Sequence, residues 1–398
     1  MKTIFLLSEF ANKKSNSTGY YWECIADFVE AKQSRIVVLA TDVEDSSSSF
    51  LKRKKIRVPR INKHKVWQRI YYQAILIAKF SLFILLRVRR GDTLICGTNP
   101  AALLIVSAIL KKFLRFDWVV LAHDIYPETM VAGGLLKTPC GIIYSILDFA
   151  FQFSYRSADR MIAIGNDMKS VIVRNKKVAE DKIIVVQNWA SDDGVVPSDR
   201  SNNPIESVLG FESKDFIFTF FGNLGRLQGV PNLLAAARLL SISAIKILFI
   251  GSGYYKSEVV RAANDPTCGN VFYYGEIEPE RRNDGLTAGD VSIVSLAKNM
   301  YGLGVPSKAY FSMLADKPLL AVMDKDSEIS LMLQEHEIGW TCLPDDPKAL
   351  ASLMELIYTS KSSWKCTMRP RHVLEKFYSH TAALEKIYHY LRSDSLST

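Results

Sequence analysis

The chain of 398 residues has few cysteines, and their spacing matches neither a disulfide framework nor a metal site. The six cysteines are scattered singly, without a C-x-x-C pair: Cys24, Cys96, Cys140, Cys268, Cys342 and Cys366. The six histidines also lack metal-ligand spacing with cysteine or glutamate. We therefore expect reduced thiols in a cytoplasmic protein, with no bound metal and no cofactor.

Long uninterrupted hydrophobic runs are also missing. The longest, Ile70–Leu86, is broken by Gln73, Lys79 and Ser81, whereas a membrane-spanning helix needs about 20 consecutive apolar residues. We therefore do not expect a transmembrane segment there. The run Thr3–Ser8 is too short for the apolar part of a secretory signal, and it is predicted to form the first strand.

Acidic residues are absent from one long segment. None occurs between Ser46 and Gly91, a stretch that contains 13 lysines and arginines. Residues 1–190 have 29 basic and 16 acidic residues, whereas the remainder has 21 and 25. The overall charge of +9 therefore comes from the first half of the chain.

The acid-free segment also holds an apolar stretch, Val66–Leu86, which is flanked by bases and contains Trp67, Tyr71 and Phe83. Bases around an apolar helix with interfacial aromatics are typical of an anionic membrane surface. The alternative is a buried helix of the first sheet with solvated bases beside it. A second apolar patch, Gly141–Phe153, leaves the same two interpretations open. Nucleic acid is not expected, because the aromatics lie among aliphatic residues and match no recognised motif.

Short β-branched runs alternate with helical segments along the whole chain, which predicts parallel α/β sheets. In the first half the expected strands are Ile4–Leu7, Arg35–Ala40, Thr93–Cys96, Trp118–Ala122, Arg160–Ile164 and Ile183–Val186. In the second half they are Phe216–Phe221, Lys246–Ile250, Val271–Tyr274, Val291–Ser295, Pro318–Val322 and Gly339–Cys342. We expect two Rossmann-like domains whose parallel sheets face each other across a crevice, with ligand beyond the carboxyl ends of the strands.

A stretch rich in Ser, Asp, Asn and Pro divides the two halves. We expect an N-terminal domain over residues 1–190, with a membrane-facing segment at 52–90, followed by a linker over 191–212. A C-terminal domain is expected over 213–375. The final residues, 376–398, are expected to form a helix that can return to pack on the N-terminal domain.

Glycine-rich turns follow several strands of the second half. In the first of these turns, Gly222 and Gly225 would let backbone amides approach a ligand closely. The next residue, Arg226, would add a charge-assisted contact to phosphate. The alternative is an ordinary strand–helix turn with a surface arginine. A second turn, Gly251-Ser252-Gly253, is a weak signal by itself.

The turn Tyr301–Lys308 is more specific. Pro306 is tolerated near the start of a helix, and Ser307 and Lys308 then fall in its first turn. A helix start with Gly, Ser and Lys is a good pocket for a diphosphate. The alternative is a surface lysine at a loop–helix junction.

In the first half, His123 and Asp124 directly follow a predicted strand. One interpretation is a positioned pair for acid–base chemistry or sugar binding. The other is a loop histidine that is hydrogen-bonded to neighbouring backbone.

Together these segments resemble GT-B glycosyltransferases of family 4, in particular bacterial surface-polysaccharide transferases of the fucosamine-transferase-like kind. The group's motifs G-N-x-G-x-x-Q-G, G-x-G, G-x-x-V-P-S-K and D-S-E are matched by Gly222–Gly229, Gly251–Gly253, Gly302–Lys308 and Asp326–Glu328. Its D-L-Y-P-D, Y-R-x-A-D and P-N-W segments resemble His123–Glu128, Tyr155–Asp159 and Gln187–Trp189. The likeness covers residues 115–375 in the right order.

The resemblance implies an α/β, GT-B fold and a retaining, metal-independent transfer of a sugar from a nucleotide-diphosphate sugar. The expected donor is a UDP-linked sugar. The resemblance also implies catalytic roles for His123 and Asp124 on the acceptor side and for Arg226 and Lys308 at the leaving diphosphate. Donor-binding residues would be Thr18, Gly19, Gly222, Asn223, Gly225, Gln228, Gly251, Gly253, Glu276, Gly304, Val305 and Ser307. The implied acceptor is a polyprenyl-diphosphate-linked glycan of O-antigen or capsule synthesis. The implied location is peripheral, on the cytoplasmic face of the bacterial inner membrane.

Two positions depart from the family pattern. Phe311 stands where the family has a glutamate that binds the ribose hydroxyls, and Asp316 stands where it has a glycine. Two alternatives therefore stay open: another GT-B sugar-nucleotide enzyme such as an epimerase, and a non-catalytic, membrane-associated scaffold. A thermal shift on adding a nucleoside diphosphate would favour an enzyme over a scaffold.

Overall fold

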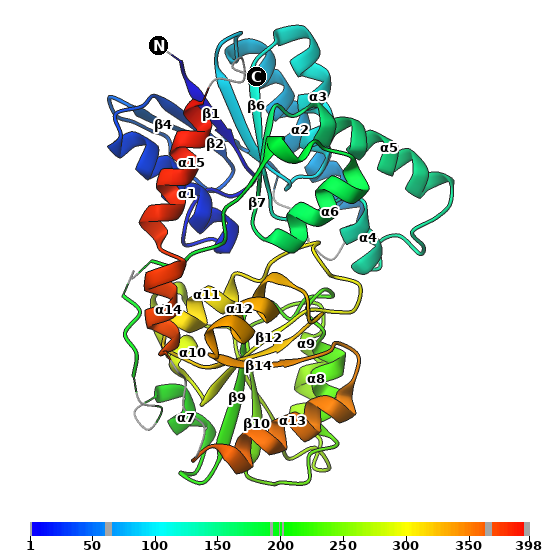
Figure 1. Ribbon diagram of the computed structural model, residues 1–398, viewed down its shortest axis with the longest axis vertical. Coiled ribbons are helices and arrows are strands. Elements are labelled where there is room, and N and C mark those ends of the chain that lie inside the picture. The colour runs from blue at the N-terminus through cyan, green and yellow to red at the C-terminus, as the bar shows by residue number, and fades with distance from the viewer. Residues whose placement is uncertain are drawn as a thin grey trace. The chain divides into compact units, whose positions relative to one another are not determined.

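The computed structural model describes residues 2–59, 66–191, 194–198, 200, 203–362 and 368–393. The chain divides into two α/β units, each built around its own parallel sheet (Figure 1). Unit 1 comprises Met1–Met130, Thr138–Gln187 and Thr381–Thr398, and unit 2 comprises Val131–Lys137 and Asn188–His380. The α/β class with two parallel-sheet domains is as predicted, whereas the limits of the units differ from the expected 190 and 376.

Unit 1 contains an eight-stranded sheet in the order β3-β4-β2-β1-β5-β6-β7-β8. The strands are β1 (Ile4–Leu7), β2 (Ile36–Ala40), β3 (Ser46–Ser47), β4 (Leu51–Lys55), β5 (Thr93–Gly97), β6 (Asp117–Ala122), β7 (Arg160–Ala163) and β8 (Ile183–Val185). Only β3 and β4 pair in antiparallel fashion. The six predicted strands are confirmed to within one residue at either end. The other two were not predicted, because β3 has only two residues and the sequence of β4, LKRKK, is strongly basic and lacks apolar alternation.

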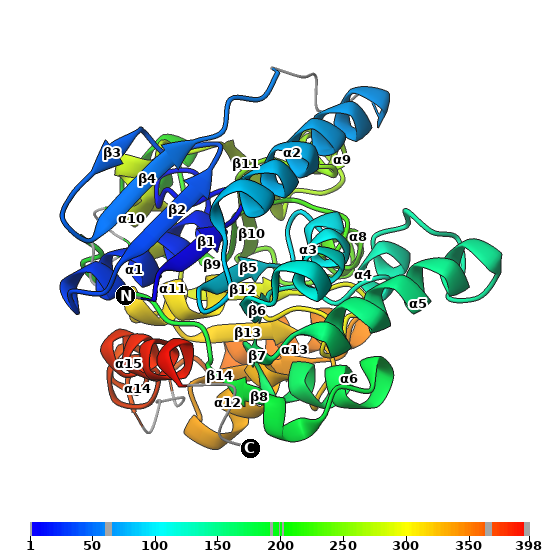
Figure 2. The same cartoon turned by 90° about the horizontal axis from the view of Figure 1, so that it is seen from above.

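Helices cover the sheet of unit 1, and they include the C-terminal helix, which belongs to this unit from Thr381 onward (Figure 2). They are α1 (Ser17–Ala31), α2 (Val66–Arg87), α3 (Ala102–Leu114), α4 (Glu128–Ala132), α5 (Ile142–Ser157), α6 (Asn166–Lys176), the 3-10 turn η1 (Glu180–Lys182) and α15 (His380–Arg392). Helix α15 is tied to unit 1 by Lys32 Nζ on Glu385 Oε1 at 2.5 Å and by the Tyr390 hydroxyl, which donates to the Lys182 carbonyl at 2.6 Å. The helix expected over 376–398 thus begins at His380, and a separate helix precedes it in unit 2.

Helix α2 matches the apolar stretch expected over Val66–Leu86 to within one residue and has 22 residues. It runs unbroken through Lys79, whose Nζ donates to the Arg57 carbonyl at 2.6 Å, and Ser81, whose hydroxyl donates to the Ile77 carbonyl at 2.7 Å. Among the described residues, the part from Trp67 to Arg87 is the one helix long and apolar enough to cross a membrane, by length and composition alone. The argument that the stretch is too short is therefore wrong. Length and composition do not distinguish a spanning helix from a surface helix.

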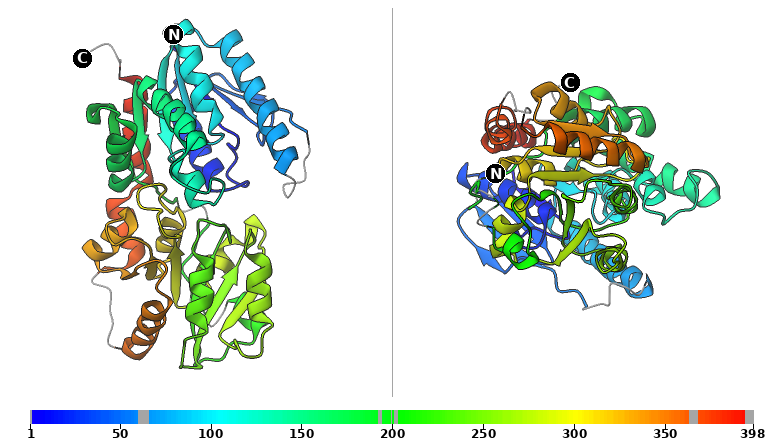
Figure 3. Two further views of the ribbon diagram at one scale, coloured as in Figure 1. Left: turned by 90° about the vertical axis from the view of Figure 1, so that its right-hand side faces the viewer. Right: turned by 90° about the horizontal axis from the view of Figure 1, so that it is seen from below.

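Unit 2 contains a six-stranded, wholly parallel sheet in the order β11-β10-β9-β12-β13-β14. Figure 3 gives two further views of the ribbon, in which this unit runs from green to orange. The strands are β9 (Phe216–Phe221), β10 (Ile245–Ile250), β11 (Val271–Gly275), β12 (Val291–Ser295), β13 (Leu319–Val322) and β14 (Gly339–Cys342). All six were predicted to within one residue. The helices are α7 (Pro204–Leu209), α8 (Val230–Ala237), α9 (Lys256–Ala263), α10 (Arg282–Thr287), α11 (Lys308–Leu314), α12 (Glu328–His336), α13 (Pro347–Ser360) and α14 (Pro370–Phe377), with the 3-10 turn η3 (Pro279–Arg281) before α10.

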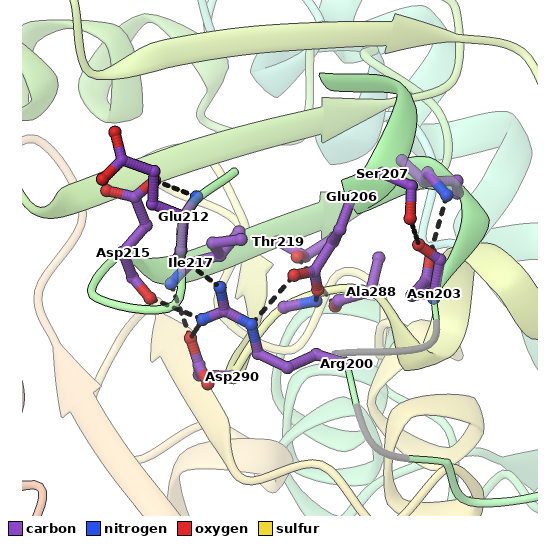
Figure 4. Close-up of polar contacts among 12 residues, drawn as sticks. Arg200, Asn203, Glu206, Ser207, Glu212, Asp215, Ile217, Thr219, Ala288 and Asp290 are labelled. Atoms are coloured by element: carbon purple, nitrogen blue, oxygen red, sulfur yellow. Dashed lines mark hydrogen bonds and ion pairs between the residues drawn. The ribbon is translucent and has the colours of Figure 1, made fainter. Parts of the chain in front are cut away.

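Part of the segment expected to be a linker is an ordered helix of unit 2. The Asn203 side chain accepts a hydrogen bond from the Ile205 amide at 2.9 Å, and Pro204 occupies the first helical position, so α7 begins there. The preceding Arg200 pairs with Glu206 at 2.8 Å and with Asp290 at 2.5 Å (Figure 4). These contacts fix residues 200 and 203–209 to the sheet. Residues 192–193, 199 and 201–202 of the expected linker lie outside the described residues.

Five cysteines are described, and none of the five forms a disulfide. Cys366 lies outside the described residues. In the described part of the chain, no group of three or more His, Cys, Asp or Glu side chains is arranged to hold a metal ion.

Candidate functional site

The sheet of unit 2 reverses its order of connection between β9 and β12, since β10 and β11 lie beyond β9 and β13 and β14 lie beyond β12. In open parallel sheets, ligands bind at such a reversal, beyond the carboxyl ends of the strands. The loop after β9 holds Gly222–Gly229, and the loop after β12 leads to Ser307 and Lys308. The two loops are joined where the Ala297 amide donates to the Leu227 carbonyl at 2.9 Å.

The ammonium group of Lys308 is buried at this reversal point without a partner. Its Nζ atom lies 3.7 Å from the centroid of the Phe220 ring and has no hydrogen-bond partner among the described residues. A Cβ atom on Gly222 would lie 3.9 Å from it. Burial lowers the pKa of Lys308 to about 7. A buried cation without a counter-charge is costly, which indicates a site built for an anion.

Two further polar atoms near the same reversal point have no partner among the described residues. They are Oε1 of Gln228, in the β9 loop, and Oγ of Ser295, the last residue of β12. Buried polar atoms in native proteins are normally hydrogen-bonded, so three unsatisfied atoms around one reversal point mark it as a candidate site for a polar ligand. Gln228 was predicted to bind the donor, whereas Ser295 was not, because a serine that ends a strand has no distinguishing pattern.

The glycines of the second turn have a packing role. A Cβ atom on Gly251 would lie 2.1 Å from the Gly222 carbonyl oxygen, and one on Gly253 would lie 2.6 Å from Leu224 backbone. The Leu224 amide also donates to the Ser252 carbonyl at 2.8 Å. These glycines therefore let the loops after β9 and β10 approach each other closely.

The predicted phosphate ligand Arg226 is exposed and lies in the β9 loop. Its guanidinium lies 3.7 Å from the ring centroid of Tyr254, and it has no hydrogen bond or ion pair among the described residues. The neighbouring Asn223 is also exposed, and its side chain fills the space beside Gly225. Glu276 is exposed in the loop that follows β11.

A buried asparagine supports the loop that carries Gly304, Val305 and Ser307. Asn188 donates from Nδ2 to the Val305 carbonyl at 3.2 Å. The sequence placed Asn188 in a motif without a role in the site. The contact shows that it positions the loop before Lys308.

The two departures from the family pattern have different surroundings. Phe311 is only 8% exposed, and the guanidinium of Arg282 lies 5.0 Å from its ring centroid. Asp316 has a φ angle of +59°, a left-handed conformation that suits glycine and is tolerated by aspartate. Its carboxylate bonds Arg369, with a distance of 2.6 Å from Nε, and thereby gains an ion pair that glycine would lack.

Unit 1 holds the remaining predicted site residues. The amides of His123 and Asp124 both donate to the Thr98 hydroxyl, at 3.1 and 3.0 Å. Burial lowers the pKa of His123 to about 4 and raises the pKa of Asp124 to about 6. At neutral pH the imidazole is therefore uncharged and most of the carboxyl is ionised. The centroid of the His123 ring lies 6.0 Å from that of the Trp22 ring, in the first half of α1.

Thr18 and Gly19 lie in the first turn of α1, where Asn16 caps the helix by accepting from the Gly19 amide at 2.8 Å. A Cβ atom on Gly19 would lie 2.2 Å from the Asn12 carbonyl oxygen. Packing against Asn12 therefore accounts for this glycine. Thr18 and Gly19, which were expected to bind the donor, are thus part of a capped helix of unit 1.

Comparisons with known proteins agree with this architecture. No family model matches the chain. A protein of Pseudomonas aeruginosa, "Probable glycosyltransferase WbjE", is 40% identical over 391 residues, which are 97% of this chain and 96% of that protein. The structure of Anabaena Alr3699/HepE in complex with UDP-glucose matches with a TM-score of 0.71 and 15% identity, over 98% of this chain and 99% of that one. WaaG, a glycosyltransferase involved in lipopolysaccharide biosynthesis, matches with a TM-score of 0.70 and 12% identity, over 98% of this chain and all of that one.

The architecture of two α/β units, each with its own sheet of mainly parallel strands, is the GT-B fold that the structural neighbours share. The chain belongs to the family of the Pseudomonas aeruginosa probable glycosyltransferase WbjE. It is therefore a glycosyltransferase, and the epimerase and scaffold alternatives are not retained.

Proposed function

We propose that the enzyme transfers a sugar from a UDP-sugar to a polyprenyl-diphosphate-linked glycan during assembly of a bacterial surface polysaccharide, O-antigen or capsule. The observation that carries the donor assignment is the buried, unpartnered Lys308 ammonium at the β9–β12 reversal. UDP-glucose bound to the structurally similar HepE supports the choice of donor, and the involvement of WaaG in lipopolysaccharide biosynthesis supports the pathway class. The fucosamine-transferase-like motifs support the same class.

The mechanism that fits these residues is stabilisation of a leaving diphosphate. A sugar–nucleotide bond has a good leaving group, so the main need is for positive charge and hydrogen-bond donors at the departing oxygens. Lys308 would supply a desolvated charge, and Arg226 would supply planar N–H donors. Gln228 and Ser295 would satisfy further polar atoms of the donor. Retention of anomeric configuration, with the acceptor proton taken by the diphosphate, is part of this proposal.

His123 and Asp124 would serve the acceptor. A neutral imidazole can accept a hydrogen bond from a sugar hydroxyl, and His123 is uncharged at physiological pH because its pKa lies at about 4. Asp124, with a pKa raised to about 6, would be mostly ionised and able to accept a second hydrogen bond.

The test of the transfer is an assay with radiolabelled UDP-hexoses and UDP-N-acetylhexosamines. The acceptor is supplied by membranes from cells in which the gene has been deleted. We expect label from one donor to enter the organic-phase lipid fraction only when the purified enzyme is added. Label that appears as free sugar alone would argue against a lipid-linked acceptor.

We also propose peripheral attachment to the anionic inner membrane through unit 1. Helix α2 buries one stripe, Leu76, Phe80 and Ile84, and leaves an apolar face exposed: Trp67, Ile70, Tyr71, Leu82, Leu85 and Leu86. A helix fixed along one stripe to its own domain suits a surface better than a span. Helix α2 contacts α3, and α3 contacts α5, so that face continues over Ile109, Phe113, Ile142, Ile143, Ile146 and Phe149. Figure 2 shows the three helices on one side of the sheet of unit 1.

Exposed bases of β4 would form the electrostatic part of this surface, and two of them, Lys52 and Lys54, line one hollow with Phe83 of α2. Lys52, Lys54 and Lys55 are exposed, whereas Arg53 is paired with Asp27. The bases Arg60, Lys63 and Lys65 of the same segment lie outside the described residues. Because each base near an anionic surface contributes about 1 kcal/mol, the three lysines provide a measurable share of the attraction.

Charge reversal at these lysines tests the membrane proposal. We expect Lys52→Glu/Lys54→Glu/Lys55→Glu to weaken binding to phosphatidylglycerol-containing vesicles by about 100-fold or more in a sedimentation assay. The matched control changes the same number of exposed bases in unit 2, as Arg238→Glu/Arg261→Glu/Lys348→Glu, and should bind as the wild type does. Equal binding by all three proteins, or a wild type that stays in solution, would refute the proposal.

A further inference from the structure

Tyr254 is the aromatic residue that directly follows Gly253 in the turn after β10, and no motif drew attention to it. Its side chain is 55% exposed. The guanidinium of Arg226 stacks on the Tyr254 ring, with the guanidinium carbon 3.7 Å from the ring centroid. That distance is well inside the range of about 6 Å at which a cation is attracted by the face of an aromatic ring.

The two residues come from different loops that are held together by backbone contacts. The Leu224 amide donates to the Ser252 carbonyl at 2.8 Å, and the Tyr255 amide donates back to the Leu224 carbonyl at 2.9 Å. On one loop, the bonded residues Ser252 and Tyr255 lie on either side of Tyr254 in the sequence. On the other loop, the bonded residue Leu224 lies two positions before Arg226. The loops that carry the Tyr254 ring and the Arg226 guanidinium are therefore held together by backbone hydrogen bonds.

The orientation of the Tyr254 ring is also restrained. It meets the Tyr255 ring edge to face, with centroids 5.0 Å apart and an interplanar angle of 85°. Tyr255 in turn packs against the hydrophobic core between the sheet and α8. An exposed ring that is held by a core neighbour loses little rotamer freedom when it supports a cation.

A stacked guanidinium keeps its hydrogen-bonding capacity. The five N–H groups of arginine lie in the plane of the group, whereas contact with a ring uses the face of that plane. One edge of Arg226 passes Gly134, where a Cβ atom would lie 3.3 Å from Nη1. Because glycine has no side chain, residue 134 does not crowd that edge.

We propose that Tyr254 is a positioning residue that holds Arg226 with its N–H groups free to bind the diphosphate of the donor. This inference rests on the proposed function. Tyr254 would affect binding of the diphosphate through Arg226, and it would not contact the nucleoside. A stacking surface for the nucleobase is the competing role for an exposed tyrosine beside a nucleotide site. The two roles differ in which part of the nucleotide is affected.

The experiment compares the affinities for UDP and UMP by calorimetric titration of the full chain. Because only UDP carries the second phosphate, the ratio of the two affinities reports the diphosphate contacts. We expect Tyr254→Leu to lower this ratio about fivefold to tenfold with unchanged UMP affinity. Tyr254→Phe should keep the ratio within twofold, because the hydroxyl is not needed. Tyr254→Gln provides a second non-aromatic variant if the leucine variant does not fold.

A double-mutant cycle with Arg226→Ala completes the test. In the Arg226→Ala background, Tyr254→Leu should have no further effect on the ratio. Additive effects, an equal loss of UDP and UMP affinity, or no change in Tyr254→Leu would overturn the inference while leaving the donor site intact. If the wild type binds UDP no more tightly than UMP, both the role of Tyr254 and the assignment of the donor site are refuted.

Discussion

Replacing Lys308 by methionine is expected to weaken UDP binding about 30- to 100-fold and at the same time to raise the melting temperature. The loss of affinity follows because a desolvated ammonium that meets a diphosphate contributes about 2–3 kcal/mol. The gain in stability follows because the folded protein buries this group over the Phe220 ring without a partner. A methionine sulfur packs well in that place, and the melting temperature should rise by about 3–5 °C.

The pH dependence distinguishes this lysine from an ordinary one. Its pKa is about 7 in the folded protein, below the 10.5 of an exposed lysine, so the unfolded chain holds a proton that the folded chain releases between these values. Lys308 therefore costs most stability below pH 7, and that cost shrinks as the pH rises toward 10.5. The stability gained by Lys308→Met should be larger at pH 6.5 than at pH 9.

Donor affinity should show the corresponding trend. Above pH 7 the lysine must take up a proton before it can bind the diphosphate, so UDP affinity in the wild type should fall by up to about tenfold per pH unit. In Lys308→Met this slope should disappear. Lys298→Met removes an exposed lysine from the same loop and serves as the control. Unchanged UDP affinity in Lys308→Met, or the same loss in Lys298→Met, would contradict the role of Lys308.

The second large effect concerns the stability of unit 1. Lys176, at the end of α6, is completely buried and pairs with Glu128 at 2.7 Å and with Asp148 at 2.8 Å. It thereby joins α6 to α4 and α5. Replacing it by methionine leaves two carboxylates without their cation, and loss of one partner of a buried pair costs about 3–5 kcal/mol. Because both carboxylates keep some solvent contact, we expect about 3 kcal/mol.

Calorimetric melting measures this loss as a fall of roughly 6–12 °C in the transition of unit 1. The control is Lys169→Met on the same helix, where the partner Glu180 is 72% exposed and the pair is expected to contribute less than about 1 kcal/mol. Similar melting temperatures for the two variants would mean that the buried network does not stabilise unit 1.

The sheets could be predicted from the sequence because their central strands are buried on both faces and appear as continuous apolar runs. The strand Leu51–Lys55 could not, since backbone pairing with β2 sets its conformation while its side chains are basic. Helix α7 was missed although Asn203, Pro204 and Gly210 mark its start and end, because the surrounding composition was that of a linker. The apolar run within α2 was judged too short to span a membrane because isolated polar residues were counted as breaks.

The donor site was predicted in part. The glycine turns and Lys308 have motif spacing, which reflects the local backbone that a phosphate site needs. Ser295 and Tyr254 have no such spacing, because their roles depend on which loops the sheet order brings together. The burial of Lys308 without a partner is likewise a property of packing, which the sequence does not show. This burial is the physical reason to expect an anion at the site.

The measurement that tests the central claim most directly is transfer of labelled sugar from UDP-sugar to the lipid fraction, compared between the wild type and Arg226→Ala. We expect activity in the wild type and a loss of about 100-fold or more in the variant, since removing one donor at the developing charge costs that much in comparable sites. Arg226→Lys should recover part of the activity, because it restores charge without planar geometry. Full activity in Arg226→Ala would contradict the proposed diphosphate site.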